Sequence, residues 1–294
     1  MIIVNGFAGL TQGAFFAIIG ILLTLMSQLT RVVNFSQLAV GMFGGFVGMT
    51  LMMNPDIQLN IWLALVVSIL ISAALSGIIG WIIATWLPSA PISNRSAVTV
   101  AALLLIVSTA SVLFGANHSN FTPVVSGNVT QFTIPGGQIV FVSQSLIALL
   151  LLALVILIAS SILLKRTMFG VRLRAISDRQ SAAELIGVNV KVLNVGVWVV
   201  SGALISLAIG FVPATISNDY ISFSLLIIGG SAAALVGAFK NPWLALVGGL
   251  LIGALQGICS AIPQVAPYKD WVVFILILVF LLWNQRKEVW DVAR

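Results

Sequence analysis

Very few side chains in this 294-residue sequence are of the types that catalyse reactions or bind metals. His118 is the single histidine, and no cluster of cysteines or carboxylates lies near it, so we do not expect a metal site. Cys259 is the single cysteine and stands in an apolar run without a clustered His or Asp to activate it. No Gly-x-x-x-x-Gly-Lys-Ser/Thr loop occurs, which excludes a P-loop ATP site. The sequence therefore predicts no catalytic residue, metal or cofactor in this chain.

Asn34, Ser36 and Gln37 form a rare polar cluster just before a glycine-rich apolar segment. Glycine allows backbone to approach a ligand closely, so we predict that these three residues lie near a substrate path or its gate. The alternative is that Asn34 or Ser36 caps the following helix, because both residue types are favoured at helix N-termini.

The most charged stretch, residues 165–191, carries the clearest local signal. Residues 177–180 (Ser-Asp-Arg-Gln) and 181–184 (Ser-Ala-Ala-Glu) both match the capping box, and Gly187 suits the position after a helix end. We predict a helix of about two turns over 178–186. So short a helix is marginal alone in water and should dock on a partner. The alternative is a connector that lies on lipid headgroups.

Helices that cross a membrane must position these residues. The composition is 60 % apolar and 7 % charged, whereas soluble domains carry about 25 % charged residues. This balance excludes a cytosolic globular enzyme, a nucleic-acid-binding domain and a disordered chain. Nine apolar segments approach the ~20 residues of a membrane span. They cover residues 7–26, 36–53, 59–87, 97–116, 141–164, 192–212, 221–238, 242–262 and 271–283.

We expect a single all-α polytopic membrane domain over residues 1–294 with eight or nine membrane spans. The second segment is short and rich in glycine, so a broken or partly re-entrant element is the alternative that leaves eight. Glycines four residues apart, such as Gly44 and Gly48 or Gly249 and Gly253, predict tight helix packing around the second and eighth segments.

The distribution of Lys and Arg predicts the orientation. With nine crossings and an outer N-terminus, Lys269 is the single basic residue outside, and the other twelve of the 13 fall inside. Cytoplasmic loops carry such an excess, so we predict an N-terminus outside and a cytoplasmic C-terminus. Residues 165–191 then form a cytoplasmic loop, and the uncharged residues 117–140 form the largest outer loop.

The predicted spans contain essentially no charged residue. A charge at membrane depth costs at least ~2.5 kcal/mol and persists where function requires it. Machines driven by protons or voltage normally keep such residues, so energy for transport should enter through the cytoplasmic loops from a partner. A Na⁺ site built only from backbone carbonyls is the alternative.

Four regions, in order, resemble the permeases of branched-chain amino acid ABC transporters, particularly their H-type subunit. The closest resemblance is in the cytoplasmic loop, with Arg-Ala-Ile-Ser-Asp at 174–178 and Ala-Ala-Glu-Leu-Ile-Gly-Val-Asn at 182–189. The other three are 13–17 (Gly-Ala-Phe-Phe-Ala) with 33–36 (Val-Asn-Phe-Ser), 228–230 (Ile-Gly-Gly) with 237–238 (Gly-Ala), and 268–270 (Tyr-Lys-Asp) before an apolar run.

The resemblance implies a permease subunit, not an enzyme, of an ABC importer for branched-chain or other small amino acids in the bacterial plasma (inner) membrane. It implies ATP-binding subunits, a second homologous permease and an extracytoplasmic substrate-binding protein as partners, with ATP and magnesium on the partner subunits. We assign coupling to the ATP-binding subunit to Arg174, Ala175, Asp178, Ala182, Ala183, Glu184 and Gly187. We assign the substrate path to Asn34, Ser36, Gln37, Gly229 and Gly230.

The sequence departs from the family pattern where a substrate path would be lined. Ser-Gln-Leu at 36–38 replaces the usual Ala-His-Gly, and Ser-Ala-Ala-Ala-Leu at 231–235 replaces Gly-Ser-x-Pro-Gly. Within the transport class, a related permease for urea or short amides, or for ribose-type sugars, is the alternative. From a different class, a channel or a structural membrane subunit is the alternative.

An importer fed by a binding protein needs an outer docking surface, and residues 117–140 are the long outer segment available. The segment has no formal charge, so contact would depend on shape and on apolar residues such as Phe121, Phe132 and Ile134. Its prolines and paired glycines predict ordered turns. The alternative is a solvated loop that only joins two spans.

Overall fold

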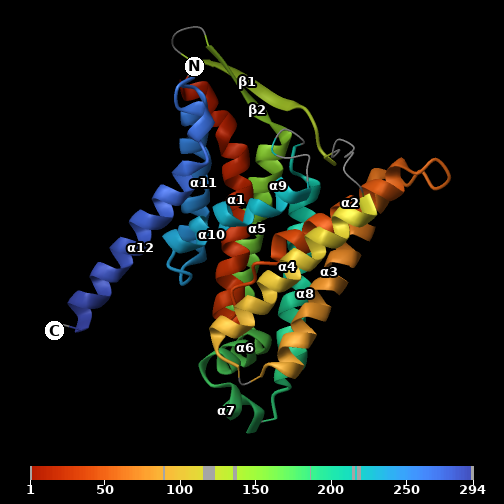
Figure 1. The fold of residues 1–294 in the computed structure, drawn as a ribbon, viewed down its shortest axis with the longest axis vertical. Coiled ribbons are helices and arrows are strands. Elements are labelled where there is room, and N and C mark those ends of the chain that lie inside the picture. Colours follow the sequence, from red (N-terminus) through yellow and green to blue (C-terminus); the bar gives the residue numbers. More distant parts are fainter. Residues whose placement is uncertain are drawn as a thin grey trace. The chain divides into compact units, whose positions relative to one another are not determined.

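The computed structural model describes residues 2–88, 90–114, 123–134, 138–185, 187–213, 216 and 220–292, with backbone only at 134, 138, 180, 181 and 284–292 (Figure 1). Most of the described chain is helical. Its elements are α1 (Ile2–Thr30), α2 (Gln37–Met53), α3 (Ile61–Trp86), α4 (Ile92–Phe114), β1 (Asn128–Ile134), β2 (Gln138–Ser143), α5 (Gln144–Arg166), α6 (Met168–Asp178), α7 (Gln180–Leu185), α8 (Val190–Gly210), α9 (Tyr220–Leu225), α10 (Ile227–Val236), α11 (Pro242–Ser260), the 3₁₀ turn η1 (Ala266–Tyr268) and α12 (Trp271–Val292).

The chain divides into two compact units. Unit 1 comprises Met1–Thr24, Ser126–Ala153 and Ile228–Arg294. Unit 2 comprises Leu25–Val125 and Leu154–Ile227. Helices α1 and α5 contribute residues to both units.

Six of the described helices are long and apolar enough to cross a membrane: α1, α3, α4, α5, α8 and α11. This confirms the class of a polytopic α-helical membrane protein. Three of the nine predicted segments form shorter apolar helices over Gln37–Met53, Tyr220–Val236 and Trp271–Trp283. A count of eight or nine full spans and the orientation of the termini therefore stay predictions.

The sequence analysis gave a broken or partly re-entrant helix as the alternative for the second apolar segment. In the structure, the seventh segment is the interrupted one. Helix α2 is continuous, but its 17 residues rise only about 25 Å, which is shorter than the apolar core of a bilayer. In the seventh segment, α9 ends at Leu225 and α10 begins at Ile227. The Leu226 N–H donates to the Phe223 carbonyl oxygen at 3.2 Å, a turn that separates the two helices.

The expectation of an all-α protein needs one correction. Strands β1 and β2 of unit 1 pair antiparallel, with Gln131 opposite Phe141. Strand β1 lies within the predicted outer loop, and β2 extends three residues past its end. The pairing is local, because the two strands are neighbours in the chain. Phe132 of β1 packs edge-on against Phe7 of α1, with ring centroids 5.7 Å apart, and this contact fixes the hairpin to the helix.

Glycine pairs bring α1 and α11 of unit 1 into backbone contact. A Cβ atom added at Gly13 would lie 2.9 Å from the Gly249 carbonyl oxygen and 3.2 Å from the Gly253 Cα. Side chains at these positions would push the helices apart, so the predicted tight packing of the eighth segment is confirmed.

Helices α2, α3 and α8 of unit 2 pack through glycines and serines. Helices α3 and α8 run side by side along this unit (Figure 1). The hydroxyl of Ser72 on α3 donates to the Val40 carbonyl oxygen of α2 at 3.1 Å, and that of Ser76 donates to the Trp198 carbonyl oxygen of α8 at 2.7 Å. Trp198 is fully buried in the apolar core of this unit with Met26. Hydroxyl groups thus pair with backbone acceptors where lipid would offer none.

Candidate functional site

The predicted polar cluster is fully buried at the start of α2. Asn34, Ser36 and Gln37 each expose no more than 1 % of their surface. The Ser36 hydroxyl donates to Asn34 Oδ1 at 2.7 Å. Within the described part of the chain, Asn34 Nδ2 and both polar atoms of the Gln37 amide have no hydrogen-bond partner. A buried amide left unpaired costs about 1–3 kcal/mol per group, so this cluster has unused binding capacity.

The capping alternative finds no support in the local geometry. Ser36 is the N-cap residue of α2, but its side chain makes no capping hydrogen bond. The Asn34 side chain accepts from the Ser36 hydroxyl instead of a backbone N–H. The Val40 N–H is satisfied by the Ser36 carbonyl oxygen at 2.9 Å.

Two residues of α4, which the sequence analysis did not select, hold the backbone that leads into this cluster. The Thr99 hydroxyl accepts from the Phe35 N–H at 3.0 Å and donates to the Ser96 carbonyl oxygen at 2.7 Å. The Ser96 hydroxyl accepts from the Val33 N–H at 3.4 Å. The signal in the sequence is a Ser and a Thr three residues apart at the start of the fourth apolar segment.

The predicted coupling loop folds into two short helices, α6 and α7, rather than one helix over 178–186. Thr167 caps α6, since its hydroxyl accepts from the Gly170 N–H at 3.1 Å. Arg179 separates the helices with extended backbone. Residues Ile176, Ala183 and Val190 of α6, α7 and α8 form a small buried apolar cluster of their own.

Gly187 occupies the position after a helix end, as predicted. Its φ of +82° lies in the left-handed region, which favours glycine. The Gly187 N–H donates to the Glu184 carbonyl oxygen at 3.0 Å, and the Val188 N–H donates to the Ala183 carbonyl oxygen at 3.1 Å. This hydrogen-bond pair, with Val188 packed near Ala183, is a Schellman motif.

The capping box predicted at Ser177 is wrong. Ser177 lies inside α6, and its hydroxyl donates to the Gln28 carbonyl oxygen at 2.5 Å. The second capping box fails as well, because Ser181 lies inside α7 rather than before it. Ser177 bonds instead to Gln28, which lies 149 residues away in the sequence. Local sequence patterns do not encode such a contact.

Most of the predicted coupling residues face solvent at one end of unit 2. Arg174, Asp178, Ala182, Glu184 and Gly187 are exposed, Ala175 is half-buried and Ala183 is buried in the local apolar cluster. The Asp178 carbonyl oxygen accepts from Arg31 at 3.2 Å, which ties the loop to the end of α1. Leu185, which was not predicted, exposes 89 % of its surface on α7. An exposed Leu beside Glu184 is a surface that a partner can bury.

The two predicted path glycines belong to unit 1, whereas the polar cluster belongs to unit 2. Gly229 lies against the ring of Phe16, and Gly230 lies against the side chain of Ile19, both on α1. Their lack of side chains lets α10 pack closely on α1.

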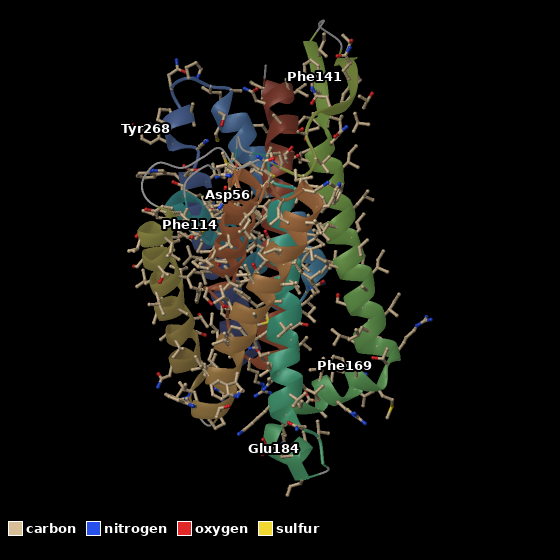
Figure 2. All side chains as sticks on the ribbon, turned by 90° about the vertical axis from the view of Figure 1, so that its right-hand side faces the viewer. Asp56, Phe114, Phe141, Phe169, Glu184 and Tyr268 are labelled. Carbon is tan, nitrogen blue, oxygen red and sulfur yellow. The ribbon has the colours of Figure 1, made fainter. Side chains whose placement is uncertain are left out.

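The predicted outer docking residues are described only in part. Phe121 lies outside the described residues, as does His118, and the side chain of Ile134 is not described. Phe132 is 41 % exposed on β1, and its ring lies nearly perpendicular to the ring of Phe7. Phe141, on the paired strand β2, is 52 % exposed (Figure 2).

An apolar pocket lies in unit 2 between the C-terminal ends of α2 and α8 and the N-terminal end of α3. It encloses about 30 Å³ of space, and the rest of it is open to solvent. Met49, Met52 and Leu65 contribute aliphatic and thioether surface. Ser206 adds a buried hydroxyl that has no hydrogen-bond partner within the described chain. Ser68 also lines the pocket, but its hydroxyl donates to the Ala64 carbonyl oxygen at 2.8 Å, which leaves the Ser206 hydroxyl unpaired in largely apolar surroundings.

The two ends of unit 2 differ in charge. Asp56 and Phe114 lie at one end, and Phe169 and Glu184 lie at the other (Figure 2). Every Lys and Arg of unit 2 belongs to the segments at the Glu184 end: Arg31, Arg95, Lys165, Arg166, Arg172, Arg174, Arg179 and Lys191. This separation agrees with the alternation of sides in the nine-segment topology, in which residues 165–191 face the cytoplasm.

Comparison with known proteins defines the class. The family described as "Branched-chain amino acid transport system / permease component" matches residues 5–281. A probable branched-chain amino acid transport permease protein LivH of Methanocaldococcus jannaschii is 28 % identical over 81 % of this chain and 75 % of its own length. The ribose import permease protein RbsC of Haemophilus influenzae is 26 % identical over 84 % of this chain and 75 % of its own.

The fold is also similar to a solved structure described as PsaBC from Streptococcus pneumoniae in complex with Fab. The TM-score is 0.53 at 14 % identity, over 94 % of this chain and 88 % of the other. Fold and family together define an ABC-transporter permease, a multi-pass protein of the plasma (inner) membrane. The chain belongs to the family of branched-chain amino acid transport system permease components, as its sequence pattern predicted.

Proposed function

We propose that this chain is a permease subunit of an ABC importer for branched-chain or other small apolar amino acids. The observation that carries the proposal is the family match over residues 5–281. The chain pairs with a second homologous permease and with ATP-binding subunits, which hold ATP and magnesium, and a substrate-binding protein delivers the substrate. A permease for ribose-type sugars is the second candidate, because the relative named as a ribose import permease is 26 % identical.

The apolar pocket of unit 2 favours an apolar amino acid over a sugar. Met49, Met52 and Leu65 offer contacts to an aliphatic side chain. A sugar would bring several hydroxyl groups to a lining whose side-chain hydroxyls are those of Ser68 and Ser206. Polar groups buried without partners oppose binding, so this lining selects against ribose.

The buried amides of Asn34 and Gln37 lie at the other end of α2 from the pocket and would contact the substrate at a second point along its path. Asn34 Nδ2 and Gln37 Nε2 are donors for a substrate carboxylate, and Gln37 Oε1 is an acceptor for its ammonium group. In the proposal, these groups contact the substrate when the path opens. Gly229 and Gly230 keep α10 packed against α1 during the opening.

Uptake by the assembled transporter tests the function. The permease, its partner permease and the ATP-binding subunits are reconstituted in proteoliposomes, and the binding protein encoded beside the gene is added with leucine, ribose or urea. ATP-dependent uptake of leucine with little uptake of the other two is expected. Uptake of ribose or urea without leucine would replace the substrate, and flux without ATP-binding subunits would indicate a channel.

Segment 174–187 is proposed as the contact with an ATP-binding subunit. Its exposed residues, its Schellman end and its position among basic residues support a surface that docks. Glu184→Arg and Gly187→Trp are expected to abolish substrate-stimulated ATP hydrolysis by the transporter without loss of membrane insertion. Gly187→Asn is the control, because Asn tolerates the left-handed conformation and should keep coupling. Normal coupling in Glu184→Arg and Gly187→Trp would exclude the assignment.

The outer segment is proposed to dock the binding protein. A Gly/Ser linker of equal length in place of residues 119–134 removes β1 and should weaken uptake while basal ATP hydrolysis stays near its original rate. Phe141→Ser is the milder variant, since this exposed side chain of β2 leaves the Phe7 contact intact. Unchanged uptake in the linker variant would place docking elsewhere.

A further inference from the structure

A second pocket of unit 2 lies at the basic end, where the candidate membrane spans α1, α3, α4 and α8 meet. It encloses about 20 Å³ of space, and the rest of it is open to solvent. Pro88 lines it just after the end of α3, Arg95 from the start of α4, and Lys191 and Asn194 from the start of α8. Helix ends of membrane spans lie in the headgroup region of a bilayer. The apolar pocket beside α2 lies at the opposite ends of α3 and α8, so the two pockets are separate.

The pocket concentrates positive charge with hydrogen-bonding capacity to spare. Arg95 and Lys191 are its charged residues, and none of the described residues that line it is acidic. One guanidinium nitrogen of Arg95 donates to the Pro88 carbonyl oxygen. The Arg95 Nε and the Asn194 Oδ1 are buried and have no hydrogen-bond partner within the described residues. A partly buried guanidinium without a carboxylate partner favours binding of an anion.

Two helix N-termini add to this preference. Lys191 is the second residue of α8, and Arg95 is the fourth residue of α4. The first turns of both helices carry backbone N–H groups without helical partners and a partial positive charge. Such helix ends favour phosphate groups. The Arg95 N–H donates to the Pro91 carbonyl oxygen and the Val192 N–H to Asn189 Oδ1, so the contribution of the two helices here is the partial charge of their ends beside Arg95 and Lys191.

The surroundings of the pocket fit the headgroup zone of a membrane. Trp86, the last residue of α3, exposes 74 % of its surface, and Ile92, the first residue of α4, exposes 54 %. Val192, beside Lys191, is 64 % exposed. Exposed tryptophan at a helix end is typical of the interface, and exposed aliphatic side chains offer a surface for acyl chains. Basic pockets between membrane helices bind anionic headgroups.

We propose that this pocket binds a phosphate group, and that the phosphate is the headgroup of an anionic membrane lipid. The Arg95 Nε and the Lys191 ammonium donate to the phosphate oxygens. Asn194 completes the site by turning its amide so that Nδ2 faces the phosphate, an exchange of O and N that leaves the shape of the side chain unchanged. The lipid then bridges α3, α4 and α8 at this end of the unit.

Native mass spectrometry of the purified, delipidated permease tests the proposal. The protein is titrated with phosphatidylglycerol, with a diacylglycerol of the same chains, and with inorganic phosphate. Arg95→Gln combined with Lys191→Gln should weaken phosphatidylglycerol binding about 25-fold, because each cation near the headgroup contributes roughly fivefold. Arg95→Lys combined with Lys191→Arg keeps both charges and should keep most of the binding. Diacylglycerol, which lacks the phosphate, should not distinguish these variants.

Lys165→Gln combined with Arg166→Gln is the matched control, because it removes two exposed charges from the same end of unit 2 outside the pocket. This control should change phosphatidylglycerol binding by less than about twofold. Equal losses in the control and the pocket variant would overturn the proposal in favour of diffuse attraction. If the pocket variant loses binding of inorganic phosphate but keeps binding of phosphatidylglycerol, the lipid proposal is overturned and the pocket is a site for free phosphate. If the double variant does not fold, Lys191→Gln changes only an exposed side chain and gives the same comparison.

Discussion

At the residue scale, Gln37 has the strongest claim to a role beyond folding. Its amide is 99 % buried, and neither polar atom has a hydrogen-bond partner within the described residues. Gln37→Leu removes this unpaired group at nearly constant volume. The free energy of unfolding of the purified permease should therefore stay the same or rise by about 1 kcal/mol. Leucine uptake should fall at least about tenfold, because the contact with substrate is lost.

Thr99→Val is the contrasting variant at this scale. It removes the hydroxyl that accepts from the Phe35 N–H and donates to the Ser96 carbonyl oxygen, so it should lower the free energy of unfolding by about 1–3 kcal/mol. Thermal unfolding of both variants separates the two roles. A Gln37→Leu protein that loses stability but keeps the uptake rate of the folded fraction would show that Gln37 is structural.

At the element scale, the packing of α3 on α8 depends on small residues at defined positions. A Cβ atom added at Gly202 would lie 2.5 Å from the Ser76 Cβ and 2.6 Å from the Ser72 carbonyl oxygen. Gly202→Ala should therefore lower stability by about 1–3 kcal/mol, the usual cost of overpacking. Gly196→Ala on the same helix meets no atom within 4 Å and should raise stability by about 0.5–1 kcal/mol through helix propensity. Equal effects of the two substitutions would contradict this packing.

At the scale of the whole molecule, the orientation is a prediction that labelling can test. Asp56 and Glu184 lie at opposite ends of unit 2 (Figure 2). In a Cys259→Ala background, Asp56→Cys should react with a membrane-impermeant maleimide in spheroplasts, whereas Glu184→Cys should react only in inverted vesicles. The permease is expressed without its partners so that the predicted coupling surface stays accessible. The opposite pattern would reverse the orientation.

The sequence by itself determined the properties that depend on composition and on neighbouring residues. Transfer into lipid depends on the length and polarity of a run, so the membrane class follows from the apolar segments. The turn at Gly187 was also predictable, because a left-handed residue after a helix end is a local requirement. The small residues of α2 and α11 likewise indicated close packing before any helix partner was known.

Only the tertiary structure decided which residues meet across the chain. Ser177 has the sequence of a helix cap, but its hydroxyl bonds to Gln28, because a distant carbonyl at the end of α1 is available only in the folded protein. Thr99 holds the backbone before α2 for the same reason. Arg95 and Lys191 come together because α4 and α8 begin at the same end of unit 2. Each of these contacts joins groups far apart in sequence, and a local pattern carries no information about the other partner.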